Sequence, residues 1–240
     1  MSKAMLDCRI EGSIGVVGGL GPFASAEFLK TIYECDLSDC EQYLPTVIMI
    51  SDPSFPDRTE DFRAGRTDDL LARLTAVLEQ LSQLGAAKII ICCVTIHYLL
   101  PRLPRHLRAR VVSLLDVIFN QVEKSQTRHL LICSSGTREL RLFENHPRWQ
   151  AASDFIVLPD ESDQEIIHRD LIYSMKTTVA AGNGAPLLKS LLRKYRVDSF
   201  IVGCSEVHIL AKAAFPANGN GSNCIDPLAI LARGIYEKSI

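Results

Sequence analysis

Short apolar runs alternate with longer amphipathic stretches along almost the whole chain. The apolar runs lack an alternating polar position, a pattern typical of strands buried on both faces of a parallel sheet. The amphipathic stretches place apolar residues three or four positions apart and therefore predict helices. We expect strands at residues 14–17, 46–50, 88–92, 111–112, 130–133, 155–158, 200–202 and 224–226. We expect helices at residues 23–33, 67–84, 98–107, 115–123, 137–143, 165–181, 186–195, 207–214 and 227–238, with a loose extension at 1–12 and loops at 51–59 and 216–223.

The alternation of strands and helices predicts an α/β fold with parallel sheets in layers. The chain also repeats itself. A strand, a turn and a helix occur near residues 14 and 130, and a strand that ends in Cys before a helix occurs near 90 and 201. This internal duplication predicts two similar, pseudo-symmetric lobes, each with a short, mainly parallel sheet flanked by helices. Because open α/β sheets bind ligands at the carboxyl ends of their strands, we expect the active site in the cleft between the lobes.

Two cysteines occupy equivalent places in this repeat. Cys93 lies in Ile91-Cys92-Cys93-Val94-Thr95-Ile96-His97, and Cys204 lies in Ile201-Val202-Gly203-Cys204-Ser205-Glu206-Val207. A thiol between a strand and a helix start lies over free backbone N–H groups and the positive end of the helix dipole, and both favour the thiolate. A single buried Cys at such a position is usually a small core residue. The recurrence of the pattern in the second half favours a functional pair.

Two thiols that face each other across a cleft suit one reaction well. One, as thiolate, removes a proton from a substrate carbon, and the other, as thiol, delivers a proton to the opposite face, which inverts the carbon without a cofactor. Backbone N–H groups at the helix starts would stabilise negative charge on the substrate carboxylate. These N–H groups belong to Val94, Thr95, Ser205 and Glu206. The side chain of Glu206 or of His97 could tune the thiols, although Glu206 could equally be a favourable acidic residue in a first helical turn.

Two basic residues are candidates for binding a substrate carboxylate. Arg58 lies in the loop after the second strand, at the edge where a ligand would bind, and an Arg there could hold a carboxylate with two hydrogen bonds. Its alternative role is a surface ion pair with Asp57 or Asp61. Lys176 lies late in a predicted helix, and considered alone it is a solvated charge.

Composition excludes several classes of function. The chain has 240 residues with 26 Lys and Arg against 28 Asp and Glu, a net charge of −2, and this balance provides no basic surface for nucleic acid or a membrane. The basic cluster at 102–110 is interpreted as a solvated helix face. Eight cysteines occur without any C-x-x-C pair, so we expect no metal site. The N-terminus has no apolar signal core and no stretch approaches 18 apolar residues, which predicts a cytoplasmic protein with reduced thiols.

Six motifs in order resemble the cofactor-independent aspartate/glutamate racemase family, over about residues 13–236. Gly18-Gly19-Leu20-Gly21-Pro22 is similar to the family's Gly-Gly-Met-Gly-Pro turn, and Phe55-Pro56-Asp57-Arg58-Thr59 is similar to its Ile-Pro-Asp-Arg-Thr loop. Cys93-Val94-Thr95-Ile96-His97 resembles Cys-Asn-Thr-Ala-His, and Gly203-Cys204-Ser205-Glu206 resembles Gly-Cys-Thr-Glu. Ser135-Gly136-Thr137 and Ile225-Asp226-Pro227 also match in place and order.

The resemblance implies a racemase of an acidic amino acid, with aspartate favoured over glutamate. It implies Cys93 and Cys204 as the proton-transfer pair, no PLP or other cofactor, no metal and a homodimer. It also implies that the C-terminal helix returns to the first lobe, which would then comprise residues 1–113 and 220–240, with 114–219 as the second lobe. Arg58 would bind the side-chain carboxylate. The other substrate contacts implied are Val94, Thr95, Thr137, Lys176, Ser205 and Glu206.

Three alternatives remain open. The family's Asn after the first Cys is Val94 here, which removes a side-chain donor and acceptor and favours an isomerase or decarboxylase of a related diacid. Gly19-Leu20-Gly21-Pro22-Phe23-Ala24 fits the dinucleotide fingerprint of an NAD-binding oxidoreductase, but Pro22 follows the second Gly directly and no acidic residue lies about 20 residues on at the end of the second predicted strand, where Asp52 comes only 33 residues after Gly19. The third alternative is a binding module without catalytic activity.

Overall fold

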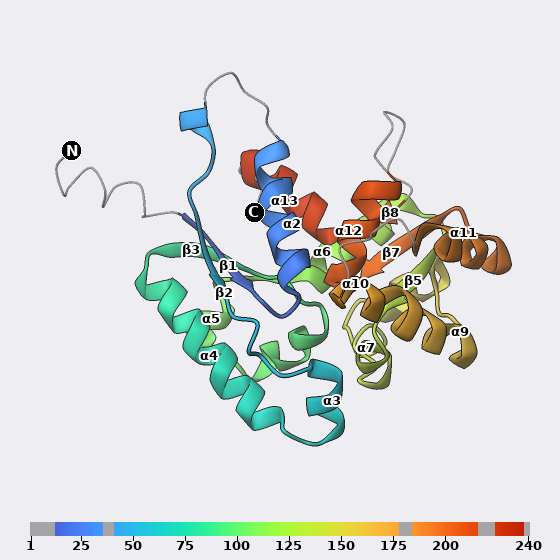
Figure 1. Cartoon of the computed structure of the whole chain (residues 1–240), viewed down its shortest axis with the longest axis horizontal. Helices are drawn as coiled ribbons and strands as arrows, with labels where there is room; N and C mark the ends of the chain where they lie inside the picture. Colours follow the sequence, from blue (N-terminus) through green and yellow to red (C-terminus); the bar gives the residue numbers. More distant parts are fainter. Residues whose placement is uncertain (1–12, 36–40, 178–183, 216–223, 238–240) are drawn as a thin grey trace.

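The structure is a computed structural model that describes residues 13–35, 41–177, 184–215 and 224–237 (Figure 1). The predicted extension at 1–12, the predicted loop at 216–223 and the end of the helix predicted at 165–181 lie outside these residues. In chain order the elements are β1 (Ser13–Gly18), α2 (Pro22–Glu34), η1 (Glu41–Tyr43), β2 (Val47–Ser51), α3 (Arg58–Arg63), α4 (Thr67–Gln83), β3 (Ala86–Ile91), η2 (Thr95–Arg102), α5 (Arg105–Arg108), β4 (Val111–Val112), α6 (Leu114–Ser125), β5 (His129–Cys133), α7 (Ser135–Glu139), α8 (Trp149–Ala152), η3 (Ser153–Phe155), β6 (Ile156–Val157), α9 (Glu161–Ile166), η4 (Ile167–Tyr173), α10 (Ser174–Thr177), α11 (Gly184–Tyr195), β7 (Ser199–Gly203), α12 (Ser205–Ala214), β8 (Cys224–Ile225) and α13 (Pro227–Tyr236).

Within the described residues the strands form two parallel sheets with the same topology. The first has the order β2-β1-β3-β4 and the second has the order β6-β5-β7-β8. The central pair of each sheet is in equivalent register, with Val17 opposite Ile91 in the first and Cys133 opposite Gly203 in the second. Because all strands are parallel, the two thiol turns lie at the carboxyl edges of equivalent strands, β3 and β7. The predicted duplication into two α/β lobes is therefore confirmed.

The strands are buried as their continuous apolar pattern predicts. Residues 89–91 of β3 and 130–133 of β5 have no exposed surface. Helix α4 covers the first sheet with one apolar stripe, since Leu70, Leu74 and Leu78 are buried at intervals of one helical turn. Each fully buried Leu or Ile side chain contributes about 1.5–3 kcal/mol to folding. The packed cores of the lobes therefore fix the positions of the strand ends, where the site lies.

The helices that follow β4 and β8 cross between the lobes. Helix α6 leaves the first sheet and packs against α8 and β8 of the second lobe, whereas α13 leaves the second sheet and packs against α2 of the first. The two crossing helices also pack against each other. Both begin at a side-chain cap, Ser113 for α6 and Asp226 for α13, as their sequences favour. One apolar cluster, which contains Phe28, Phe119 and Leu228, therefore joins both lobes.

The C-terminal segment returns to the first lobe later than predicted. Cys224 and Ile225 pair with Phe200 and Ile201 of β7, so they belong to the second sheet. The predicted first-lobe segment at 220–240 therefore begins, among the described residues, only at Pro227. The physical reason is that a fourth strand completes the second sheet in the same way that β4 completes the first.

Several helix boundaries differ from the predicted ones. The loop predicted at 51–59 ends early, because the Asp57 side chain accepts hydrogen bonds from the N–H groups of Thr59 and Glu60 and starts α3 at Arg58. The helix predicted at 165–181 begins at Glu161, capped by Asp160, and contains a π-helical segment, Ile167–Tyr173. Other differences are that α7 ends at Glu139, that the helix predicted at 98–107 is divided into η2, which begins at Thr95, and α5, that α11 begins at Gly184, and that η1, α8 and η3 lack a predicted counterpart.

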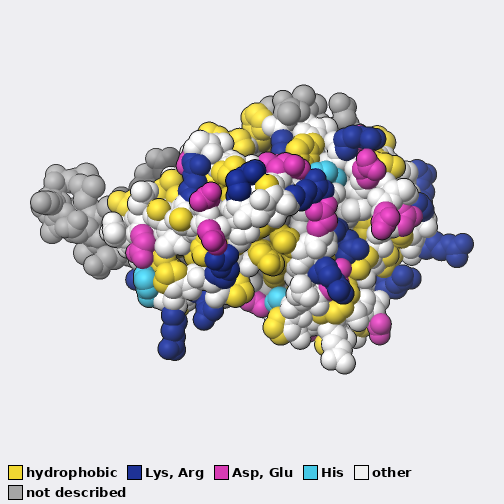
Figure 2. Space-filling model, turned by 90° about the horizontal axis from the view of Figure 1, so that it is seen from below, with side chains coloured by type: hydrophobic (Ala, Val, Ile, Leu, Met, Phe, Trp, Pro, Cys, Tyr) yellow, Lys and Arg dark blue, Asp and Glu magenta, His cyan; other side chains and the backbone are white. Residues whose placement is uncertain are grey.

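The surface agrees with the charge balance. On the face shown in Figure 2, positive and negative side chains are interspersed between apolar ones. No helix among the described residues combines the length and apolar character that crossing a bilayer requires.

Candidate active site

The first thiol turn begins where β3 ends. Cys92 points into the apolar core, and burial raises the pKa of its thiol. Cys93 keeps 7% of its surface exposed and its N–H donates to the carbonyl of Ile91 at 2.8 Å. The element that follows is the 3-10 helix η2 and not the α-helix that we predicted. The free N–H groups near Cys93 therefore belong to a tight turn, and the contribution of a long helix dipole is lost.

His97 supports this turn from behind. Its Nδ1 hydrogen-bonds with the carbonyl oxygen of Cys93 at 2.8 Å, and its Nε2 accepts from the N–H of Leu114 at 3.1 Å. The acceptor role of Nε2 leaves the proton on Nδ1, which donates to Cys93. Burial lowers the pKa of His97 to about 4, so the ring is neutral at physiological pH. His97 thus holds the backbone of Cys93, and we assign it no direct effect on the thiol.

The second thiol turn carries a carboxylate. Cys204 is the N-cap residue of α12, and its Sγ donates to Oε2 of Glu206 at 2.9 Å. Ser205 Oγ donates to the same oxygen at 3.2 Å. Burial raises the pKa of Cys204 well above its ordinary value, and the negative charge of Glu206 and its hydrogen bond raise it further. This thiol is therefore held in its protonated form, whereas the charge of Lys176 acts in the opposite direction.

The glycine turn of the first lobe packs directly against Glu206 of the second. A Cβ atom on Gly21 would lie 2.3 Å from Glu206 Oε1. Gly19 adopts a φ of +84°, and a Cβ there would meet the backbone of Asp52 at 2.3 Å. The glycines of this turn are therefore explained by close packing and a left-handed conformation. The carboxylate beside Gly21 also disfavours the dinucleotide alternative, because it would repel a pyrophosphate there.

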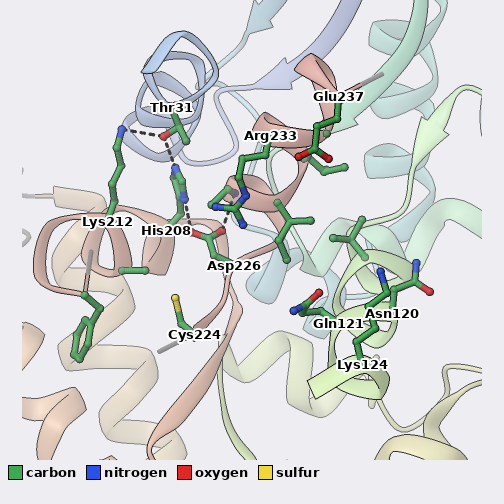
Figure 3. Close-up of a pocket in the computed structure, with 17 residues that line it drawn as sticks. Thr31, Asn120, Gln121, Lys124, His208, Lys212, Cys224, Asp226, Arg233 and Glu237 are labelled. Carbon is green, nitrogen blue, oxygen red and sulfur yellow. Dashed lines mark hydrogen bonds and ion pairs between the residues drawn. The ribbon is translucent and has the colours of Figure 1, made fainter. Parts of the chain in front are cut away.

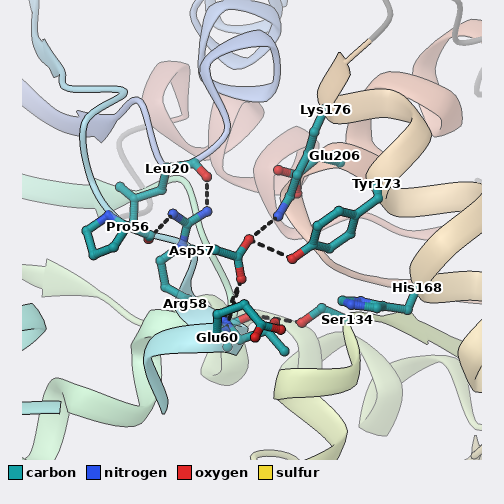
Figure 4. A network of polar contacts seen from close by, with 12 residues as sticks. Leu20, Pro56, Asp57, Arg58, Glu60, Ser134, His168, Tyr173, Lys176 and Glu206 are labelled. Carbon is teal, nitrogen blue, oxygen red and sulfur yellow. Dashed lines mark hydrogen bonds and ion pairs between the residues drawn. The ribbon is translucent and has the colours of Figure 1, made fainter. Parts of the chain in front are cut away.

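Arg58 is buried beside the first thiol turn. Its guanidinium donates to the carbonyl oxygens of Pro56, at 2.7 Å, and of Leu20, and its Nε is buried without a partner (Figure 4). Burial lowers the pKa of Arg58, but the negative charges of Cys93, Asp57 and Glu206 outweigh it and raise the pKa overall. The alternative role in a surface ion pair is wrong, because the side chain is only 8% exposed. Its cationic group instead faces the charged centre of the site.

Lys176 reaches the same centre from the second lobe. Its Nζ donates to Asp57 Oδ2 at 2.9 Å, and Tyr173 donates to the same oxygen at 2.7 Å (Figure 4). These bonds, together with the charge of Lys176, hold the pKa of Asp57 well below its usual range despite its burial. Burial and the bond to Asp57 raise the pKa of Tyr173 to about 12. Lys176 is therefore an inter-lobe contact, and the prediction of a solvated charge is wrong.

Hydroxyl groups join the lobes below this centre. Thr95 Oγ1 lies 2.9 Å from Thr137 Oγ1 and 3.1 Å from Ser134 Oγ, and all three are buried. Nearby, a Cβ on Gly136 would lie 2.6 Å from Thr59 Oγ1, so the contact between the lobes leaves no room for a side chain at this position. These hydroxyl groups therefore hydrogen-bond to one another across the boundary between the lobes.

Electrostatic interactions connect these groups into one site. The thiolate form of Cys93 interacts with both Arg58 and Cys204, and the charge of Glu206 and the thiolate form of Cys204 interact with Lys176. The structure thus brings together nearly all of the predicted residues. They are Cys93, Cys204, Arg58, Thr95, Thr137, Lys176, Ser205 and Glu206. Val94 is different, because its side chain is 2% exposed and belongs to the apolar inter-lobe cluster.

Three polar residues of the site were missed by the sequence prediction. Asp57 was considered only as an ion-pair partner for Arg58, although its place before Thr59 and Glu60 favours a helix cap. Tyr173 lies three residues before Lys176, and this spacing on a helix could have indicated a shared face. Ser134 gave no signal, because its contact with Thr95 depends on how the lobes meet. Among the described residues, no three His, Cys, Asp or Glu side chains are grouped so that they could hold a metal ion.

The fold and the site together define a class: a two-lobed α/β protein with one buried thiol from each lobe and cationic side chains between them. Residues 17–235 match the sequence profile of the Asp/Glu/hydantoin racemases, and the chain belongs to that family.

Solved structures agree with this fold. The aspartate racemase of Picrophilus torridus is 18% identical with a TM-score of 0.78, over 95% of this chain and 94% of that chain. An aspartate racemase homologue from Pyrococcus horikoshii OT3 is 20% identical with a TM-score of 0.64, over 95% and 99%. A glutamate racemase from Francisella tularensis subsp. tularensis SCHU S4, in complex with D-glutamate, is 16% identical with a TM-score of 0.63, over 94% and 80%. At such identities the likeness shows the fold.

Proposed function

We propose that the chain is a cofactor-independent racemase of an acidic amino acid, with aspartate favoured over glutamate. The observation that supports this most is the placement of Cys93 and Cys204 at equivalent strand ends, in one network of charges. The site also holds two cations, Arg58 and Lys176, as a dicarboxylic substrate requires. Aspartate is favoured because the motifs resemble those of aspartate racemases most.

The proposed reaction moves one proton in each direction. The thiolate of one cysteine removes the Cα proton, which leaves the electron pair on the substrate, and the thiol of the other delivers its proton to the opposite face. In one direction Cys93 is the base, beside the guanidinium of Arg58, and Cys204 is the acid, protonated beside Glu206. After one turnover the protons have exchanged places, so the enzyme is ready for the reverse direction.

The substrate contacts follow from the charges. Arg58 would bind the side-chain carboxylate through its free Nε, and Lys176 would leave Asp57 in part to bind the same ligand. Thr95, Thr137 and Ser205 would donate hydroxyl groups, and backbone N–H groups at both turns would stabilise the carboxylate as charge develops. The proposed contribution of Val94 is limited to its backbone, because its side chain packs in the apolar cluster.

The test is an assay of the purified protein with L- and D-aspartate and L- and D-glutamate in D₂O, without added cofactor. We expect interconversion of the enantiomers by chiral chromatography, and deuterium at Cα by NMR. Removal of PLP by treatment with hydroxylamine and dialysis should leave the rate unchanged. Absence of both inversion and Cα deuteration with all four substrates would overturn the proposal.

A second function is supported by one observation. Val94 has no side-chain amide and its side chain packs in the apolar cluster, so the site lacks the polar group that the family's Asn would offer to an amino substituent. An isomerase or decarboxylase of a related diacid would need fewer polar groups, because a substrate without an amino group has no such substituent to bind. The same assay with small diacids separates the two, because released CO₂ or a shifted double bond would indicate the second function. We also propose a homodimer, to be measured by light scattering, and a cytoplasmic location.

A further inference from the structure

A buried histidine follows each thiol at the same distance along the chain. His97 lies four residues after Cys93, and His208 lies four residues after Cys204. The exposed surface of these rings is 3% and 0%. Each makes two hydrogen bonds through its two ring nitrogens, so neither has a free nitrogen to exchange protons with a substrate.

Both histidines reach the start of the helix that crosses to the other lobe. His97 binds the N–H of Leu114, the first residue of α6. His208 Nδ1 lies 2.6 Å from Asp226 Oδ2 (Figure 3). Asp226 is the cap of α13 and accepts hydrogen bonds from the N–H groups of Leu228 and Ala229. The two contacts are equivalent in the pseudo-symmetry, although one uses a backbone N–H and the other a carboxylate.

The connection to the thiol differs between the lobes. His97 bonds directly to the carbonyl of Cys93 at 2.8 Å. His208 lies within α12, whose N-cap is Cys204, and its Nε2 lies 2.9 Å from Thr31 Oγ1 of α2 (Figure 3). Because α2 begins at the glycine turn that packs on Glu206, His208 fixes α12 relative to the wall of the second thiol site. One histidine therefore holds the turn itself, and the other holds the helix that carries it.

We propose that His97 and His208 are a matched pair of positioning residues, each of which fixes the preceding thiol by tying it to the helix that crosses to the other lobe. Proton transfer needs a thiol within a fraction of an ångström of its productive place, and displacement by about 1 Å costs on the order of a hundredfold in rate. Among the described residues, the hydrogen bonds of the two rings do not go to Arg58 or Lys176, so substrate binding should change little when the histidines are replaced. The inference deepens the proposed function, on which its kinetic test rests.

The variants are chosen to remove one bond at a time. His97→Asn keeps a donor for the Cys93 carbonyl and loses the acceptor for Leu114. His208→Asn keeps a donor for Asp226 and loses the bond to Thr31, whereas His208→Gln does the reverse. His106→Asn is the matched control, because His106 is exposed and hydrogen-bonds with Glu79 on the surface.

The first readout needs no substrate. Iodoacetamide labelling at fixed pH, read by mass spectrometry of the peptides, reports the reactivity of each thiol separately. We expect His97→Asn to change the labelling rate of Cys93 by about threefold or more and to leave Cys204 unchanged, and His208→Asn to do the opposite, since reactivity follows the local environment of the thiolate. Equal changes at both thiols, or none, would overturn the proposal whether or not the protein is a racemase.

The second readout is kinetic. We expect kcat to fall by about tenfold to a hundredfold with KM nearly unchanged in both His→Asn variants. The isotope effect of Cα-deuterated substrate should rise for one enantiomer in His97→Asn and for the other enantiomer in His208→Asn, because each step becomes slow only when its own thiol is the base. A rise for the same enantiomer in both would contradict the matched roles. If His208→Asn does not fold, as judged by circular dichroism, His208→Gln and Asp226→Asn, which keeps the helix cap, carry the same two tests.

Discussion

The two thiol turns share a backbone plan and differ in charge. Both follow the third strand of their sheet, yet Cys93 faces the guanidinium of Arg58, whereas Cys204 donates a hydrogen bond to the carboxylate of Glu206. The first turn enters a 3-10 helix and the second enters an α-helix of ten residues. A duplicated fold has thus been given opposite electrostatic surroundings at its two equivalent points.

This difference shows how two chemically identical groups can hold different roles before a substrate arrives. A cation beside one sulfur gives a negative charge there a counter-ion, and a carboxylate beside the other keeps its proton in place. The charges are coupled, since Glu206 also acts on Arg58 and Lys176. Four substitutions test whether the two thiol turns differ in this way, and they follow in decreasing order of expected effect.

Removal of either thiol should have the largest effect. Cys93→Ala and Cys204→Ala should each lower racemisation by about a thousandfold or more, because each variant lacks one of the two proposed proton-transfer groups. Chiral chromatography measures the loss. Each variant should still exchange Cα hydrogen with D₂O for one enantiomer, a different one in each case. Full racemisation by either variant would refute the two-thiol mechanism.

Glu206→Gln should make the electrostatic surroundings of the two thiols more alike, because it removes the negative charge beside Cys204. Removal of the carboxylate lowers the pKa of Cys204, because its charge and its hydrogen bond both raise that pKa in the native protein. Cys204 should then be alkylated several-fold faster near pH 8, and the alkaline limb of the pH–rate profile should move to lower pH. Labelling of Cys204 in a Cys93→Ala background measures the shift, and an unchanged profile would show that Glu206 does not control the proton.

Lys176→Gln should shift the pKa of Cys204 in the opposite direction. The charge of Lys176 lowers the pKa of Cys204, so its removal raises that pKa and slows alkylation. The effect should be smaller than that of Glu206→Gln, because Lys176 is engaged by Asp57. The same labelling experiment serves as the measurement, and faster alkylation would contradict the assignment. KM for the acidic substrate should also rise.

Gly136→Ala should have the smallest effect on chemistry and a measurable one on stability. The new Cβ would meet Thr59 at 2.6 Å, so the lobes must separate slightly. Overpacking of this kind costs about 1–3 kcal/mol, which denaturant unfolding can detect. Turnover should fall only a few-fold. Gly65→Ala is a useful control for added volume, because a Cβ there meets no atom within 4 Å, although its φ of +72° adds strain of its own.

Much of the fold could be predicted from local patterns. The buried strands, the helix at Thr67–Gln83 and the two thiol turns follow from apolar periodicity and from the repeat. The strand at Cys224–Ile225 was found, but its assignment to the second sheet was not, because two residues carry no information about their neighbours. The π segment at Ile167–Tyr173 also escaped prediction, since periodicity does not distinguish it from an α-helix.

The sequence predicted which residues belong to the candidate site, but it did not predict the contacts between them. Arg58, Lys176 and Glu206 were named from motifs, but their partners depend on how the lobes meet. The contact of Lys176 with Asp57 spans 119 positions in the chain, and that of Thr31 with His208 spans 177. Val94 was expected in the site because its neighbours are there, and the tight turn directs its side chain into the core instead. Such contacts arise from tertiary structure, which no local pattern specifies.

The exchange of α6 and α13 between the lobes means that neither half of the chain can bury its apolar surfaces alone. Either half alone would leave the apolar face of its crossing helix uncovered, along with the surface that receives its partner's helix. A half-length chain could cover both only by trading helices with a second copy of itself. The present protein thus resembles a domain-swapped dimer whose two halves are joined in one polypeptide. Because the halves are parts of one chain, their sequences need not be identical, and they can differ in charge.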